Sequence, residues 1–230
     1  MPMRWVFGLG LLTLAVLAGC NSASAPVPEG QKSFVSGETL NLEGTLAYWP
    51  SGETGKIFNL AASSAANHIY EGNIEKDGHF ILTAGAPPRN ALSGMGKCED
   101  QLTINPPNPK ILWLTFAASK NGSFAGYVEE TEGGVKDEQQ GLTKIEYVYN
   151  GGPGTWFKGT CKIVYDTGGA LVQTQQVTFK QVYLYPGWNA VEMTLDRYVH
   201  TRTELTEEFS ATVALDEVGF SWVFKDFYAQ

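Results

Sequence analysis

The feature that most constrains the fold of this 230-residue chain is the recurrence of short strand-like segments, each closed by a turn signal. From Thr39 onward, alternating or fully apolar runs end at groups such as Pro-Ser-Gly, Asp-Gly and Asn-Gly, which is typical of antiparallel strands. Long amphipathic windows with the period of a helix are missing. The pattern therefore predicts an all-β chain, either one antiparallel β-sandwich-like fold or two packed β subdomains that divide near 119–123.

The expected strands fall into hairpin-sized units rather than βαβ units. They are 40–49, 56–63, 68–76, 79–84, 111–119, 123–130, 144–150, 160–166, 177–185, 190–196, 207–215 and 218–228. Asp77-Gly78 joins two of them and predicts a tight hairpin turn. The stretch from Gly72 to Leu82 resembles the hairpin of small prealbumin-like sandwich modules in bacterial surface proteins, which implies a sandwich here.

Composition limits the classes of partner. The chain is 43% hydrophobic and 17% charged, with a formal charge of -8, so it can build a sizeable core. Such an acidic surface repels phosphate backbones, and we expect no nucleic-acid partner. The sequence contains no motif that predicts a cofactor.

The first twenty residues predict export. One basic residue, Arg4, precedes an uncharged apolar stretch that is short for a membrane span, and a small-residue boundary follows. Leu17-Ala18-Gly19-Cys20 resembles the lipobox of bacterial lipoproteins. The resemblance implies that residues 1–19 are a signal peptide, that Cys20 is lipidated with acyl chains such as palmitate, and that the protein is anchored to a membrane outside the cytoplasm.

Residues 20–38 form the expected link between anchor and fold. They are small, polar and proline-containing, so they bury too little apolar surface to order themselves and are expected to form a flexible tether. Asn21, which follows the lipidated cysteine, favours the outer membrane if the cell has one. The folded region is then 39–230. An ordinary signal peptide cut after Ser22-Ala23-Ser24-Ala25 is the alternative.

A second resemblance spans most of the mature chain. Tyr147-Val148-Tyr149, then Gly159-Thr160, then Gly187-Trp188-Asn189 resemble the succession of motifs in a group of uncharacterised β-sandwich lipoproteins of the bacterial envelope. This chain differs in having Pro186 where that group often has a polar residue. The resemblance implies location and fold, and no activity.

Two cysteines remain once Cys20 is lipidated. In an exported protein this even remainder predicts a disulfide between Cys98 and Cys161, with two buried thiols as the alternative. The disulfide would clamp the proline-rich stretch 85–110 to the second half of the chain. That stretch is long for an irregular loop, so it is either a contact surface or a strap across one end of the sandwich.

Three tryptophans at expected turns are candidate binding residues. Trp49, Trp156 and Trp188 stand beside proline and glycine, and indoles exposed at loop tips make stacking contacts with glycans or peptides. The alternative is that they fold back and close the ends of the core. Trp113 and Trp222 lie inside expected strands and are core candidates.

Metal binding and catalysis have weaker support. His68, His79 and His200 stand at no familiar ligand spacing, and the acidic run 129–138 lacks the order of a calcium loop, so it is expected to be a solvated loop. No metal site is predicted. Neither Gly122-Ser123 nor Gly219-Phe220-Ser221 forms a nucleophile elbow, so no catalytic residue is assigned.

The sequence therefore predicts a lipid-anchored protein of the cell envelope with a non-enzymatic binding or structural role. Its partners would be the membrane, through Cys20, and an envelope protein or glycan. Two alternatives stay open. One is an envelope hydrolase that acts on glycan through two carboxylates distant in the sequence, and the other is an extracytoplasmic metal-binding protein.

Overall fold

The computed structural model describes residues 32–60, 68–94, 98, 101–166 and 172–226. Apart from one short 3-10 turn, η1 (Arg89–Ala91), the regular elements of these residues are strands, and the predicted all-β class is confirmed. The strands are β1 (Leu40–Thr45), β2 (Gly55–Asn59), β3 (Glu71–Ile74), β4 (His79–Ala84), β5 (Leu102–Asn105), β6 (Ile111–Leu114), β7 (Phe116–Lys120), β8 (Ser123–Glu132), β9 (Thr143–Asn150), β10 (Thr155–Asp166), β11 (Val172–Leu184), β12 (Gly187–His200), β13 (Glu204–Val213) and β14 (Phe220–Asp226).

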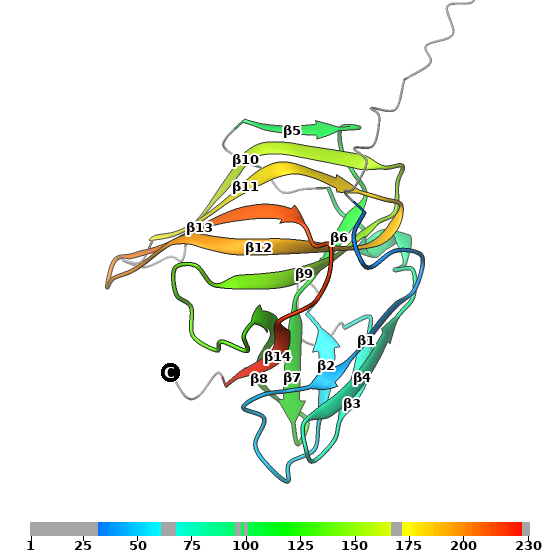
Figure 1. Cartoon of the computed structure of the whole chain (residues 1–230), viewed down its shortest axis with the longest axis vertical. Coiled ribbons are helices and arrows are strands. Elements are labelled where there is room, and N and C mark those ends of the chain that lie inside the picture. Colours follow the sequence, from blue (N-terminus) through cyan, green and yellow to red (C-terminus); the bar gives the residue numbers. More distant parts are fainter. Residues whose placement is uncertain (1–31, 61–67, 95–97, 99–100, 167–171, 227–230) are drawn as a thin grey trace, which may run out of the picture.

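The strands belong to one continuous, strongly bent sheet. Its order is β1-β4-β3-β2-β7-β8-β9-β12-β13-β11-β10-β5, with β14 paired to β8 and β6 paired to β9. Neighbours are antiparallel except β11 and β13, which are parallel. Figure 1 shows two halves, with β5, β10, β11, β13 and β12 above β9, and β1 to β4, β7, β8 and β14 below it.

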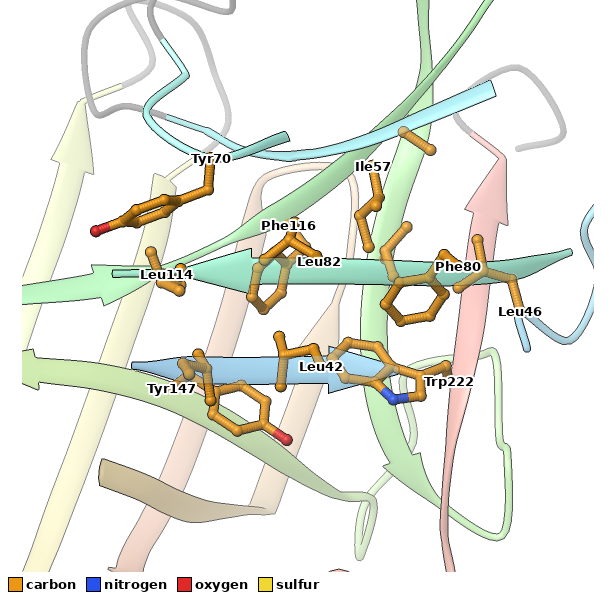
Figure 2. Packing of buried hydrophobic residues seen from close by; sticks show 14 of the residues in the cluster. Leu42, Leu46, Ile57, Tyr70, Phe80, Leu82, Leu114, Phe116, Tyr147 and Trp222 are labelled. Carbon is orange, nitrogen blue, oxygen red and sulfur yellow. The ribbon is translucent and has the colours of Figure 1, made fainter. Parts of the chain in front are cut away.

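The first core fills the lower half. Ile57, Phe80, Phe116 and Trp222 point toward one another from β2, β4, β7 and β14 (Figure 2). The aromatic rings meet edge to face, with 5.2 Å between the Phe80 and Trp222 centroids, an arrangement that adds to the free energy gained by burial. The Ala47 N–H donates to the Trp222 carbonyl, and the Ala47 carbonyl accepts from the Phe224 N–H. The chain after β1 is thereby joined to β14, which closes this half of the sheet.

The second core lies on the other face of β9 and β12. Along β9, Tyr147 and Tyr149 belong to the first core, whereas Val148 belongs to the second. Along β12, Trp188 belongs to the first core and Val191 to the second. Successive side chains of a strand point to opposite faces, so these two strands form the wall that both cores share.

No cut in the sequence separates the two cores, and the expected boundary near 119–123 is wrong. Residues 120–123 are the tight turn between the paired strands β7 and β8, inside the first half. Strand β6, which precedes β7, contributes Ile111 to the second core and Leu114 to the first, so a single strand belongs to both. The chain returns to the first half at its end, through β14.

The expected tether, 20–38, is too long, because residues 33–38 contact the fold. Ser33 is 4% exposed, and its hydroxyl accepts a hydrogen bond from the Ala190 N–H at 2.8 Å. The Tyr149 hydroxyl donates to the Glu38 carboxylate at 2.5 Å. Phe34 and Val35 cover part of the first core. The folded region therefore begins earlier than predicted. Two apolar residues among polar neighbours are a weak signal in the sequence, so the prediction missed them.

Candidate binding cleft

A cleft of 570 Å³ opens where the two halves of the sheet part. Its position follows from the pairing of β9, which bonds to β8 at Lys144 and Ile145 and to β6 from Tyr147 onward. Glu146 lies between these two pairings. The cleft is lined by Ser93, Gly94, Trp113, Leu114, Thr115, Phe116, Val128, Glu129, Lys144, Ile145, Glu146, Ile163, Gln175, Val177, Met193 and Phe209.

One wall of the cleft holds a chain of ion pairs. Lys144 Nζ lies 2.9 Å from Glu146 and 3.7 Å from Glu129. Glu129 also contacts the ammonium of Lys225, which lies 2.6 Å from Glu138. The side chains of Lys144 and Lys225 are only 15% and 14% exposed. Charges this deeply buried require such partners, because water no longer solvates them.

The pairing keeps these groups ionised. Burial alone would raise the pKa of Glu129, but the ammonium groups of Lys144 and Lys225 outweigh it and lower that pKa. Burial alone would lower the pKa of Lys144, but Glu146 and Glu129 outweigh it and raise that pKa. The pKa of Lys225 is raised in the same way, against burial, by Glu129 and Glu138. Glu129, Lys144 and Lys225 are therefore charged across the physiological pH range.

A different carboxyl group, that of Glu130, is buried on the side of the first core. It is 4% exposed and accepts a hydrogen bond of 2.6 Å from the Tyr147 hydroxyl. Desolvation raises the pKa of Glu130 from 4.5 to about 7, although the hydrogen bond from Tyr147 opposes the shift. Glu130 is absent from the cleft lining, so the strand β8 directs one acid to the cleft and its neighbour to the core.

This burial predicts a pH-dependent stability. Between pH 4.5 and about 7 the folded protein holds a proton on Glu130 that the unfolded chain releases, so stability falls as pH rises through this window and the dependence ends above it. In wild type, the free energy of unfolding should fall by about 3 kcal/mol in total across this window. We expect this fall to disappear in Glu130→Gln, whose amide does not titrate. Urea unfolding of both proteins at pH 4.5, 6 and 8 measures it. Parallel curves for the two proteins would contradict the assignment.

The disulfide predicted between Cys98 and Cys161 is present. It fastens the proline-rich stretch to β10, and the same stretch contributes β5, which pairs with β10 at the edge of the sheet. Ser93 and Gly94, also from this stretch, line the cleft. The structure thus shows a strap that is fixed to the second half and borders the cleft.

The three candidate tryptophans do not form an exposed stacking surface. Trp49 is 8% exposed and its indole N–H donates to the Glu53 carbonyl. Trp188 is fully buried against Tyr149, because the turn before it directs its side chain into the first core. Trp156 is half-buried on β10, with its ring 4.9 Å from that of Tyr183. Proline and glycine beside a tryptophan mark a corner of the core here.

The tryptophan that does reach the cleft is Trp113, which the sequence assigns to the core. It is partly buried on β6.

The acidic run 129–138 is only partly a solvated loop, which corrects the prediction from the sequence. Glu129 and Glu130 belong to β8, and Glu138 is ion-paired. Glu129 pairs with Lys144 from the next strand and with Lys225 from the last one, so the acidic run by itself does not indicate its burial.

The histidines lie apart from the cleft and from one another. His68 contacts Glu71 at 2.9 Å, and His79 contacts Glu43 at 3.2 Å. His200 lies near Tyr198 at the far end of β12. Within the described ranges, no group of three or more histidine, cysteine or acidic residues is placed to hold a metal ion. Cys20 lies outside the described residues.

Comparison of the chain with protein-family models, with curated proteins and with solved structures finds no match. In the part of the chain that the structure describes, no helix has both the length and the apolar character needed to cross a membrane.

Proposed function

We propose that this protein is a lipid-anchored binding protein of the cell envelope, and that the cleft between the two halves of the sheet is its binding site. The observation that carries the proposal is the cleft itself. Its volume of 570 Å³ falls in the range of small-molecule sites, and its lining combines apolar walls with a few partly buried charged groups. Most of the lining residues come from strands of both halves of the sheet, which hold the cleft in a fixed shape.

The alternative of a glycan hydrolase has one point in its favour. Glu129 and Glu146 both line the cleft, and because one ammonium lies 3.7 and 2.9 Å from them, their oxygens lie less than about 7 Å apart, within reach of glycosidase geometry. A general acid, however, needs a raised pKa. The pKa of Glu129 is lowered, and the carboxyl with a pKa of about 7, Glu130, faces the core. These facts favour binding over hydrolysis.

The anchor is proposed from the motif at Cys20, and the structure limits its reach. Twelve residues separate Cys20 from Ser33, the first of the described residues with a buried side chain. Even a fully extended chain of this length spans at most about 45 Å. The cleft would therefore stay close to the membrane surface, so its ligand would be a component of the envelope or a compound that reaches it.

The anchor is tested by Cys20→Ala. We expect this change to leave an uncleaved precursor without acyl label, because the thiol that carries the lipid and defines the cleavage position is gone. Metabolic labelling with a palmitate analogue, followed by mass spectrometry of the N-terminus, measures both effects. Normal maturation and labelling of the variant would refute the anchor.

Binding at the cleft is tested by filling it. Val177→Trp places a large side chain on the cleft wall, whereas Val172→Trp adds the same side chain at an exposed position of the same strand. We expect wild type and Val172→Trp, isolated from envelopes, to retain a small molecule that mass spectrometry of the extract detects and that Val177→Trp lacks. The same extract from all three proteins would contradict the site.

A further inference from the structure

We infer that the ligand class of this cleft is an organic cation, namely an amine or ammonium compound with an apolar body. The inference rests on the proposed binding function and adds the chemistry of the ligand. It follows from the charges that reach the cleft and from the rings that line it.

The charges favour a cation. Among the described lining residues there are two carboxylates, Glu129 and Glu146, and one ammonium, Lys144. Lys144 is already bound to both carboxylates, so an anionic ligand would have to compete with them for it. Behind this wall, Lys225 and Glu138 neutralise each other. A ligand with one positive charge would balance the remaining carboxylate.

Glu207 is a further acid beside the charged wall. This residue of β13 is two positions from Phe209, and its pKa is raised, first by burial and then by the charge of Glu138. Glu129 also raises that pKa, whereas Lys144 and Lys225 lower it, so Glu207 lies within the field of the charged wall. In a site partly closed to water, the unbalanced carboxylate of the lining attracts cations more strongly than it would at the surface.

The aromatic walls suit the apolar body of such a ligand and its cationic head. Trp113, Phe116 and Phe209 line the cleft. Lys144 Nζ already lies 5.4 Å from the centroid of the Phe209 ring, which shows that a ring face in this cleft accepts a positive charge. An ammonium compound would find both the carboxylates and the rings along one wall.

The test uses three probes with the same apolar body: 4-phenylbutylamine, 4-phenylbutanol and 4-phenylbutyrate. Calorimetric titration of the folded chain is expected to show the amine binding about tenfold more tightly than the alcohol, and the acid more weakly than either. The advantage of the amine should shrink in 0.5 M salt. Equal or tighter binding of the alcohol or the acid would overturn the inference and leave the binding site intact.

Two variants locate the charge effect. Glu146→Gln removes the excess negative charge of the lining, and Glu53→Gln removes the same charge from an exposed loop. We expect Glu146→Gln to weaken amine binding about tenfold without changing alcohol binding, and Glu53→Gln to change neither. An equal loss in both variants would assign the preference to the acidic surface and overturn the inference. If no probe binds wild type, and if Val172→Trp and Val177→Trp also give identical extracts, the proposed binding site is rejected.

Discussion

Trp188→Ala is expected to lower the free energy of unfolding by about 3–5 kcal/mol, the usual cost of removing a buried tryptophan from a core. The indole is fully buried. It packs against Tyr149, at 5.2 Å between ring centroids, and Tyr70, at 6.0 Å. Because it stands on β12, in the wall that both cores share, little can move to fill the space it leaves. Chemical denaturation of the purified domain measures the loss.

Trp156→Ala is the matched control. It removes the same side chain from another position that the sequence marks as a turn, but this tryptophan is only half-buried, on β10 near the edge strand β5. We expect a clearly smaller loss of stability. A loss for Trp156→Ala equal to or larger than that for Trp188→Ala would contradict the placement of Trp188 at the centre of the wall.

Removal of the disulfide by Cys98→Ala with Cys161→Ala is expected to cost about 4 kcal/mol. The two cysteines are 63 residues apart, and a cross-link over that distance restricts the unfolded chain strongly. The cross-link also holds the strap against β10. Urea unfolding under oxidising conditions, for wild type and the double variant, measures the difference.

The reducing agent provides the control for this prediction. Reductant should destabilise wild type by a similar amount and leave the double variant unchanged, because the variant has no bond to reduce. If wild type and the double variant unfold at the same urea concentration without reductant, the bond contributes nothing and the account of the strap is wrong.

Local signals in the sequence predicted local features of the fold. Asp77-Gly78 does join β3 and β4, with Gly78 at a positive φ of 86° and the Asp77 side chain accepting from the His79 N–H. The parity of the cysteines predicted the bond between Cys98 and Cys161. Each of these features is decided by a few neighbouring residues or by the number of cysteines that are left to pair.

Features that depend on distant residues could not be predicted in this way. The burial of Trp188 depends on Tyr149 and Tyr70, which come from distant parts of the chain. The cleft exists because β9 exchanges β8 for β6 as its neighbour. Sequence alternation shows that a strand has two faces, but it does not show that both faces of β9 meet a core. The parallel pairing of β11 with β13 is likewise invisible in the sequence.

The charged wall was missed for the same reason. Glu129 and Glu138 stand in an acidic run with two glycines, which by itself is typical of a solvated loop. Their neutralisation depends on Lys144, from the next strand, and Lys225, from the last one. A lysine inside an otherwise apolar strand, as at Lys225, is the one sequence signal that could have suggested a buried ion pair.

Ligand binding in the cleft can be observed at Met193, whose side chain lines the cleft and is 7% exposed. NMR of the chain labelled at its methionine methyl groups, with the Met193 signal assigned by Met193→Leu, reports contact at this one position. We expect 4-phenylbutylamine to shift this signal until the site is saturated, and Val177→Trp to abolish the shift. A Met193 signal that does not move, while the amine binds elsewhere or not at all, would contradict binding in the cleft.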